Sequence, residues 1–369
     1  MSTPYLTLNV VELTRETDDA VTIHLEHPDR QPLASEAGQF LTLILPCGPG
    51  GKKERRAYSL SSTPSDAPRL SVTVKRVTGG LVSNYLLDTV RVGQQLEVLA
   101  PLGSFVLKTS PKSARSLVLI GAGSGITPLM SMLKAVLREE PQSHVLLVYG
   151  NRNEAAVIFG EQLRQLEAQA TGRLQVEHIY SQPTGPVAAH QHVGRLNRTT
   201  LLRILEQRHQ FPAAQADYYL CGPEGMMLEA KAALDLLGVP AGQVRRESFV
   251  AAAETQEAAA AQPGGHGDVS VADADGQSTT RTVTINYEGS EYRLAVAPHQ
   301  TILEAALDLD IDLPYSCQAG LCTACRGKCL SGKVHLDERE GLSDAEMRQG
   351  YVLVCVAHPL TADVVIEID

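Results

Sequence analysis

Four cysteines near the C-terminus have a spacing that could hold a metal centre. Cys317, Cys322 and Cys325 form a Cys-x4-Cys-x2-Cys run, and Cys355 follows alone in "VLVCVAH". This spacing is typical of a plant-type [2Fe-2S] cluster, which is held by four thiolates. Structural zinc is the competing interpretation, although zinc sites usually pair two short Cys or His clips. Cys329 lies outside the ligand spacing and is interpreted as a spare thiol.

A glycine-rich turn, "GAGSGITPLMSML", could bind a dinucleotide. It follows the apolar strand "LVLIG" and opens a predicted helix. Gly121, Gly123 and Gly125 would let the backbone approach a pyrophosphate, and the helix N-terminus would supply N–H donors and a positive dipole. The turn does not match the G-x-G-x-x-G pattern, and no acidic residue follows clearly at the ribose-binding spacing. A tight structural turn is therefore the alternative.

Two segments upstream have residue types that could hold a second anionic ligand. In "RRAYSLSS", residues 55–62, strand geometry would place Arg56 and Tyr58 on one face. "VKRVTGGLVSNYL", residues 74–86, supplies two glycines and puts Ser83 at a predicted helix N-cap. Each segment alone is more often structural, with Arg56 a solvated charge. Their order relative to the glycine-rich turn is what makes them informative.

These motifs fall in regions with different hydrophobic patterns. Residues 1–110 alternate short apolar strands with Gly, Pro and Ser turns, which is typical of an antiparallel barrel. Residues 111–250 alternate apolar strands with helices and predict a doubly wound parallel sheet. Residues 251–281, rich in Ala, Gly, Asp, Gln and Ser, predict a flexible linker. Residues 282–369 predict a small α+β module that carries the cysteine loop.

Charge and hydropathy narrow the classes of partner. The chain of 369 residues has a net charge of −10 and no basic run longer than "KKERR", which argues against nucleic acid or an anionic membrane as the main partner. The charge is +2 over residues 1–250 and −8 over residues 282–369, so the cysteine-rich end is acidic. No apolar stretch has membrane-spanning length and the N-terminus does not resemble a signal peptide, so we expect a cytoplasmic protein. His190 and His192 are interpreted as loop residues rather than metal ligands.

The ordered motifs "RAYS", "GGLVSNYL", "GAGSGITPLMS", "YGNRNE" and "CGPEGMM" resemble the ferredoxin–NADP reductase superfamily. With the C-terminal ferredoxin-like module, the chain resembles the reductase components of bacterial oxygenases, and its domain order is most similar to the reductase subunits of phenylacetyl-CoA epoxidase complexes. The resemblance implies a multidomain fold. Its parts would be a Greek-key antiparallel β-barrel for FAD, a doubly wound parallel α/β sheet for NADP and a β-grasp ferredoxin.

The same resemblance implies roles for the motif residues in binding FAD. Arg56, Tyr58 and Ser59 would hold FAD, with Arg56 against the pyrophosphate and Tyr58 against the flavin or its ribityl chain. The remaining flavin and pyrophosphate contacts would come from Val74, Lys75, Arg76, Val77, Gly80, Leu81, Val82 and Ser83.

The resemblance also implies a nicotinamide site, with Thr127, Cys221 and Glu247 nearest the reacting atoms. Thr127 would stand where the two cofactors meet, while Gly222 and Pro223 would continue the nicotinamide border beside Cys221. Phe249 matches the position of an aromatic ring over the flavin, and simple core filling is its alternative.

Choice of nicotinamide depends on the adenosine end of the site. Arg152 in "YGNRNE" and Ser181 in "YSQPTG" are candidates to bind a 2′-phosphate, because a guanidinium matches phosphate bidentately. Gln182 stands where many NADP-using relatives carry an arginine. We expect NADPH, with NADH as the alternative.

Together these features predict an NAD(P)H-dependent oxidoreductase. Electrons would pass from NADPH to FAD, then to the [2Fe-2S] cluster, then to an oxygenase partner of the diiron phenylacetyl-CoA epoxidase type. The chain shows no diiron, haem or Rieske ligand set of its own, and the acidic ferredoxin module offers a docking face for the partner. The alternatives are the reductase of a steroid or aromatic-ring hydroxylase, a stand-alone electron carrier, and a zinc-binding interaction module without electron transfer.

Overall fold

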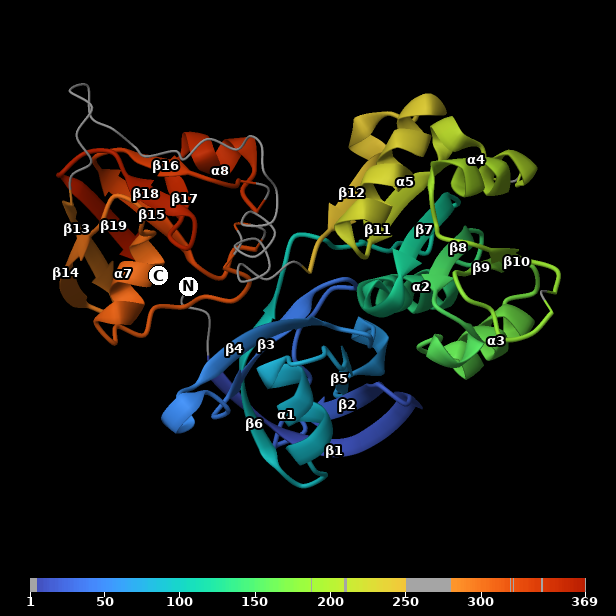
Figure 1. The fold of residues 1–369 in the computed structure, drawn as a ribbon, viewed down its shortest axis with the longest axis horizontal. Helices are drawn as coiled ribbons and strands as arrows, with labels where there is room; N and C mark the ends of the chain where they lie inside the picture. The colour runs from blue at the N-terminus through green and yellow to red at the C-terminus, as the bar shows by residue number, and fades with distance from the viewer. Residues whose placement is uncertain are drawn as a thin grey trace. The chain divides into compact units, whose positions relative to one another are not determined.

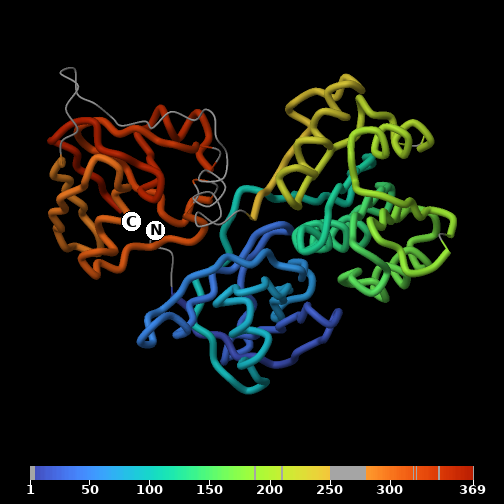
Figure 2. Tube along the Cα trace, viewed as in Figure 1, coloured from blue at the N-terminus to red at the C-terminus, as the bar shows by residue number. Residues whose placement is uncertain are grey.

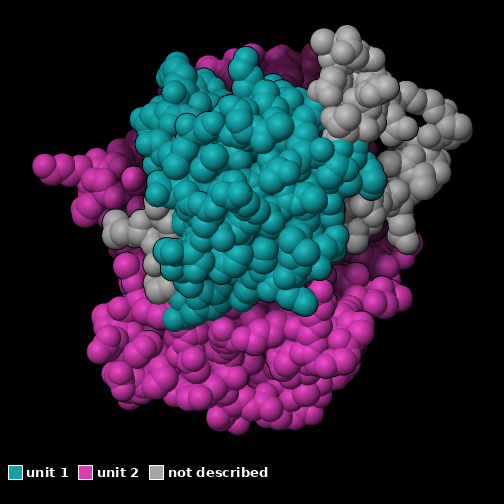
Figure 3. Space-filling model, turned by 90° about the vertical axis from the view of Figure 1, so that its left-hand side faces the viewer, with its two compact units in different colours: residues 1–5, 250–369 teal, residues 6–249 magenta. Residues whose placement is uncertain are grey.

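The computed structural model describes residues 5–186, 188–208, 211–249, 280–318, 320, 322–339 and 341–368. The chain divides into two compact units, residues 6–249 and residues 250–369, the latter together with residues 1–5 (Figure 3). The predicted linker, residues 251–281, lies outside the described residues except for its last two. Within the described ranges, no helix has the length and apolar character needed to span a membrane.

The first part of the larger unit is the predicted antiparallel barrel. Its sheet has the strand order β4-β3-β6-β1-β2-β5, and a bridge between Leu60 and Val72 joins the two outer strands. Since β6 returns beside β1, the connections follow a Greek key. Alternate strand positions such as Leu41, Leu43 and Ile23 fill the interior. The elements are β1 (Tyr5–Thr17), β2 (Ala20–Glu26), β3 (Phe40–Leu45), β4 (Glu54–Ser59), β5 (Leu70–Lys75), α1 (Leu81–Thr89) and β6 (Gln95–Leu102).

A six-stranded parallel sheet of order β10-β9-β8-β7-β11-β12 forms the second part (Figure 1). Its central strands are buried on both faces, which is why "LVLIG" and "HVLLVYG" read as continuous apolar runs. Helices α2 and α3 cover one face, and α4 and α5 the other. The elements are β7 (Ser116–Ala122), α2 (Ile126–Glu139), β8 (His144–Asn151), α3 (Gly160–Gln169), β9 (Leu174–Tyr180), β10 (Gln191–Val193), α4 (Arg198–Gln207), β11 (Asp217–Cys221), α5 (Glu224–Leu236) and β12 (Val244–Glu247).

This strand order fixes where a ligand can bind. The chain runs outward from β7 through β8 and β9 to β10, then crosses to β11 on the other side of β7. Ligands of open α/β sheets bind beyond the carboxyl ends of the strands where the order reverses, here between β7 and β11. The doubly wound sheet is therefore confirmed, and it brings the glycine-rich turn beside "CGPEGMM".

The smaller unit has the α+β composition expected of a β-grasp. A five-stranded mixed sheet of order β14-β13-β19-β15-β17 packs against α7, and β16 and β18 form a separate ribbon (Figure 2 traces the chain). A capping box between Thr301 and Glu304 starts α7. The elements are β13 (Arg281–Tyr287), β14 (Ser290–Val296), α7 (Ile302–Asp308), β15 (Arg326–Ser331), β16 (Val334–Leu336), α8 (Asp344–Arg348), β17 (Tyr351–Leu353), β18 (Ala357–Pro359) and β19 (Val364–Ile368).

Candidate functional site

The glycine-rich turn packs tightly against the end of β11. A Cβ at Gly125 would overlap the carbonyl oxygen of Cys221, and one at Gly121 would lie 2.7 Å from Leu129 Cδ1. Gly123 has a φ of +56°, a conformation that side-chain-bearing residues rarely adopt. The turn is the short 3-10 helix η3 (Gly123–Gly125), which leads directly into α2. Close packing at Gly121 and Gly125 and the backbone conformation of Gly123 thus favour glycine at these positions, in addition to the predicted binding of a ligand.

Thr127 lies in the first turn of α2 with its side chain buried. Its Oγ1 donates to the carbonyl oxygen of Ser124 at 3.0 Å, and the hydroxyl of Tyr149 donates to that of Gly123, also at 3.0 Å. The two bonds hold the turn in shape from both sides. Tyr149 was not among the predicted site residues, although a tyrosine inside a buried strand has a hydroxyl that needs a hydrogen-bond partner.

Three predicted residues meet where the barrel adjoins the carboxyl edge of the sheet. Cys221 ends β11 and is paired in register with Glu247, which ends β12. Ser59 at the end of β4 donates its hydroxyl to Glu247 Oε2 at 3.2 Å. Burial and the neighbouring Glu247 carboxylate raise the pKa of the Cys221 thiol well above its ordinary value, so it is neutral at physiological pH. The buried, neutral Cys221 thiol is therefore part of the packed surface of this corner and does not act as a nucleophile.

The neighbours of Cys221 and Glu247 occupy different environments. Gly222 packs closely against the glycine-rich turn, since a Cβ there would lie 3.1 Å from the backbone nitrogen of Ala122, and Pro223 is the N-cap residue of α5. Phe249 follows β12 with 44% of its surface exposed, so it does not fill a core in the described residues. Its exposure leaves the ring available to a planar ligand.

The Arg-x-Tyr-Ser motif lies on β4, as expected. Arg56 is part-exposed, pairs with Glu54 at 3.4 Å and donates to the carbonyl oxygen of Arg55 at 2.7 Å. The ring of Tyr58 packs against the barrel core, and burial raises the pKa of its hydroxyl far above its usual value. The motif therefore presents a cation, a partly buried ring and the Ser59 hydroxyl along one short strand.

The segment after β5 differs from the sequence expectation at Ser83. Gly80, not Ser83, is the N-cap of α1, and Ser83 lies inside the helix. The prediction of Ser83 as N-cap was wrong because the helix begins directly after the second glycine. Ser83 Oγ instead accepts the N–H of Val77 at 3.0 Å, which closes the turn onto the helix. A Cβ at Gly80 would lie 2.8 Å from that oxygen.

The other side chains of this segment divide between core and surface. Val74 and Val82 lie in the barrel core, so any contact they make with FAD would run through their backbone. Val77 and Leu81 are exposed. Lys75 pairs with Asp19 at 3.7 Å, and Arg76 holds α1 through two bonds to Asp88 of 2.6 and 2.9 Å.

The predicted phosphate-binding residues are brought together by two adjacent loops. Ser181 N–H donates to Asn151 O at 3.0 Å, and Gln182 N–H donates to Arg152 O at 2.7 Å. Arg152 and Ser181 are both exposed at the carboxyl ends of β8 and β9. Sequence analysis missed Glu154, whose carboxylate lies in the same loop pair.

The four predicted metal ligands gather in the smaller unit. Cys325 Sγ lies 3.1 Å from Cys355 Sγ, and Cys317 neighbours both Cys322 and Cys355. Hydrogen bonds among these thiols, together with burial, raise the pKa values of Cys322 and Cys355 far above the ordinary range. Four crowded thiols ionise together only beside a strongly cationic centre, so this donor set fits an iron-sulfur cluster.

Close packing of two loops shapes the cysteine site. Gly320 has a φ of +70°, and a Cβ there would lie 2.8 Å from Glu338 Cβ. A Cβ at Gly341 would lie 2.7 Å from the carbonyl oxygen of Gly320. In the described ranges no three His, Cys, Asp or Glu side chains are arranged to hold one single metal ion. Cys329 lies apart in β15 and donates its thiol to Ser331 O at 3.2 Å.

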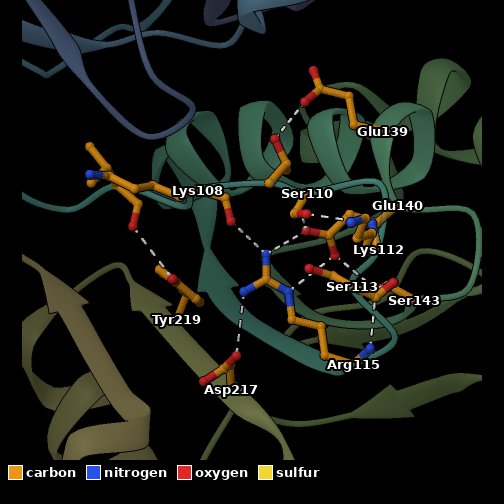
Figure 4. Close-up of polar contacts among 12 residues, drawn as sticks. Lys108, Ser110, Lys112, Ser113, Arg115, Glu139, Glu140, Ser143, Asp217 and Tyr219 are labelled. Atoms are coloured by element: carbon orange, nitrogen blue, oxygen red, sulfur yellow. Dashed lines mark hydrogen bonds and ion pairs between the residues drawn. The ribbon is translucent and has the colours of Figure 1, made fainter.

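A polar network fastens the connection between barrel and sheet (Figure 4). Glu140, with none of its surface exposed, accepts two bonds from Arg115 at 2.7 and 3.1 Å and one from the Ser110 N–H at 3.1 Å. Arg115 also pairs with Asp217 at 3.5 Å, and the hydroxyl of Tyr219 donates to Val106 O at 3.4 Å. The chain entering β7 is therefore held to both α2 and β11.

Three family models match consecutive parts of the chain. They are the oxidoreductase FAD-binding domain over residues 7–107, the oxidoreductase NAD-binding domain over residues 119–232 and the 2Fe-2S iron-sulfur cluster binding domain over residues 285–360. Together they cover the barrel, the parallel sheet and the cysteine-containing unit.

Whole proteins match along nearly the full chain. A subunit of 1,2-phenylacetyl-CoA epoxidase from Escherichia coli is 35% identical over 100% of this chain and 98% of its own. The ferredoxin reductase component of 3-ketosteroid-9-alpha-monooxygenase from Rhodococcus rhodochrous is 37% identical over 98% and 96%. Among solved structures, phthalate dioxygenase reductase has a TM-score of 0.56 at 25% identity, covering 99% of this chain and 98% of its own.

Proposed function

This chain belongs to the family of oxygenase reductase components that join FAD-binding, NAD-binding and [2Fe-2S] domains, and we propose that its acceptor is a phenylacetyl-CoA epoxidase-type diiron oxygenase. As a member, it is an oxidoreductase that passes electrons from a nicotinamide dinucleotide to an oxygenase. We further propose that it works in the cytoplasm, where the cysteines stay reduced. The domain limits of 1–110, 111–250 and 282–369 belong to the same proposal.

Flavin chemistry explains why three cofactors share one chain. When bound, FAD takes two electrons as hydride and releases them singly to a [2Fe-2S] cluster. Arg56 supports the proposal as the cation for the FAD pyrophosphate, and the N-terminus of α1 at Gly80 offers further N–H donors. Tyr58 offers a partly buried ring beside the flavin.

The corner formed by Ser59, Cys221 and Glu247 is the proposed place of hydride transfer. Ser59 comes from the barrel, whereas the other two end neighbouring strands of the sheet, so this contact aligns the two cofactor-binding surfaces. The neutral thiol of Cys221 excludes water without adding charge. Glu247 holds its carboxylate on the Ser59 hydroxyl, where it can also accept a proton.

The single observation that carries the proposal is the gathering of Cys317, Cys322, Cys325 and Cys355. A flavin domain joined to a nucleotide domain serves many reductases, whereas a four-cysteine module at the end of the chain provides a one-electron exit. These thiolates would hold the cluster, and the loop containing Glu338 and Gly341 would shield one side of it.

Reconstitution tests the proposed acceptor. Purified reductase is combined with the oxygenase subunits of a phenylacetyl-CoA epoxidase, and epoxide formation is measured with NADH or NADPH. We expect product only when all components are present. The second candidate is a ketosteroid monooxygenase, favoured by the 37% identity to such a reductase over 98% of this chain. Product formation with the ketosteroid oxygenase but not with the epoxidase subunits would reject the epoxidase proposal.

A further inference from the structure

The inference concerns the loops after β8 and β9, and it rests on the proposed function of the parallel sheet as the nicotinamide domain. The glycine-rich turn and Cys221 lie at the ends of β7 and β11, so the nicotinamide end of a dinucleotide belongs there. The adenosine end then extends across the neighbouring strands β8 and β9 (Figure 1). The residues that follow these two strands therefore determine whether the adenosine ribose can carry a 2′-phosphate or only a free 2′-hydroxyl.

Hydrogen bonds continue between the two loops beyond the ends of the strands. Backbone bonds join Ser181 to Asn151 and Gln182 to Arg152. Two residues further along each loop, Glu154 Oε2 accepts the Thr184 hydroxyl at 2.7 Å and the Thr184 N–H at 3.1 Å. These hydrogen bonds hold the two loops side by side, and the loops carry Arg152, Ser181, Gln182, Glu154 and Thr184.

The carboxylate of Glu154 is fixed rather than free. Glu154 begins the short 3-10 helix η4 (Glu154–Ala156), which the Asn153 side chain caps by accepting the Ala156 N–H at 3.2 Å. The hydrogen bonds from Thr184, with one from the backbone of Gly185, lower the pKa of Glu154, so it is ionised at neutral pH. The loop pair therefore carries a permanent negative charge two residues beyond Arg152.

We propose that Glu154 makes this site select NADH over NADPH. Its carboxylate already occupies the hydroxyl and N–H donors of Thr184 that could otherwise bind a 2′-phosphate, and its charge repels that phosphate. An acidic side chain in this place instead accepts a hydrogen bond from an unmodified ribose hydroxyl. Arg152 is the one guanidinium among these five residues, and Glu154 brings the formal charge of the five side chains to zero. The Glu154 carboxylate therefore favours NADH, the alternative to the NADPH expected from the sequence.

The experiment uses the full chain with its cofactors bound and ferricyanide as electron acceptor. Initial rates are measured with NADH and with NADPH, and binding of 5′-ADP and 2′,5′-ADP is measured by calorimetry. We expect wild-type kcat/KM to be at least tenfold higher with NADH. Glu154→Gln keeps the side-chain size and should raise kcat/KM for NADPH about tenfold, mainly through KM, and tighten 2′,5′-ADP more than 5′-ADP.

Glu161→Gln is the matched control, because it removes the same charge from an exposed position of α3 that pairs only with its own helix in the described contacts. It should leave the preference unchanged. A wild-type preference for NADPH, or an equal change of the ratio in both variants, would overturn the inference while the proposed function stands. If neither nucleotide reduced the bound flavin, the proposed function would fail and the inference with it.

Discussion

Ser59 is the residue through which the barrel contacts the predicted hydride-transfer corner. Removing its hydroxyl leaves the Glu247 carboxylate without the donor at 3.2 Å. We expect Ser59→Ala to slow flavin reduction about tenfold and to cost about 1 kcal/mol of stability, the typical net value of one hydrogen bond. Stopped-flow absorbance under anaerobic conditions measures the first effect and thermal unfolding the second.

The control for that variant is Ser65→Ala, which removes a hydroxyl bonded to Glu139 at the surface, away from the corner. Its rate of flavin reduction should match wild type. An equal rate in Ser59→Ala would mean that the contact with Glu247 has no part in aligning the cofactors.

Cys325 and Cys329 offer a paired test of the cluster ligands, since only the first belongs to the spacing. Cys325→Ser should abolish the [2Fe-2S] absorption and EPR signals, because serine replaces a required thiolate. Reduction of cytochrome c should fall at least tenfold, whereas NADH-dependent reduction of ferricyanide persists. Cys329→Ser should keep the cluster signals and the rate of cytochrome c reduction. Loss of flavin reduction in Cys325→Ser would contradict the proposed order of carriers.

For single residues, the sequence predicted functional sites whose members lie close together in the chain. The spacing of Cys317, Cys322 and Cys325 was readable because the ligands share one loop, and the structure gathers them with Cys355. Glu154 and Tyr149 were missed because their importance comes from partners 30 and 26 residues away. The positions of side chains around such contacts depend on the packing of whole elements.

Helix α2 carries several of the contacts that hold barrel and sheet together. Lys134, nearly buried, pairs with Asp66 at 3.3 Å, Arg138 pairs with the same carboxylate at 2.5 Å, and Ser131 donates to Ser62 O at 2.5 Å. Its C-terminal end reaches Arg115 through Glu140. Because Thr127 lies at the other end of this helix, movement of α2 would disturb the turn beside Cys221.

Glu140→Gln tests that connection through stability. The variant leaves Arg115 without its closest anion, and breaking a buried pair costs about 3 kcal/mol. For a unit of this size, that loss corresponds to a melting temperature roughly 6–12 °C lower. Asp235→Asn, which breaks an exposed pair with Lys231, should change it by less than about 2 °C.

The stabilisation of the fold by Glu140 should weaken in acid. Burial opposes ionisation of Glu140, but the hydrogen bonds from Arg115, Ser143 and the Ser110 N–H hold its pKa below the usual 4.5. Its stabilisation is therefore complete above that value and is lost as the pH falls through the folded-state pKa. The difference in melting temperature between Glu140→Gln and wild type should shrink as the pH falls from about 5 to about 3. A gap that widened with acid would show that Glu140 is not ionised in the folded protein.

Elements were predicted best where burial leaves a strong pattern. The helix predicted to begin at the glycine-rich turn is α2, and the apolar strand "LVLIG" before that turn lies in β7. The start of α1 was misplaced because Gly80 and Ser83 are both suitable residues near a helix N-terminus, and only the backbone decides between them. The buried ion pairs of α2 could not be predicted, since a charged residue on a helix usually faces water.

For the whole molecule, the uneven charge predicts how the two units respond to salt. Residues 282–369 carry 14 acidic and 6 basic side chains, so this cysteine-containing part of the chain has a net charge of −8. A basic surface on the oxygenase would be attracted to it over a Debye length of about 30 Å at 0.01 M salt and about 10 Å at 0.1 M. Transfer of electrons inside the chain needs no such encounter between proteins.

We therefore expect salt to slow the step to the oxygenase selectively. Raising the salt concentration from 0.02 to 0.3 M should lower the rate of oxygenase reduction about tenfold or more, because steering by complementary charge is screened. NADH-dependent ferricyanide reduction by the same preparation is the internal control and should change less than about twofold. Stopped-flow reduction of the oxygenase component measures the first rate directly. Equal salt dependence of the two reactions would show that the acidic unit does not steer its partner.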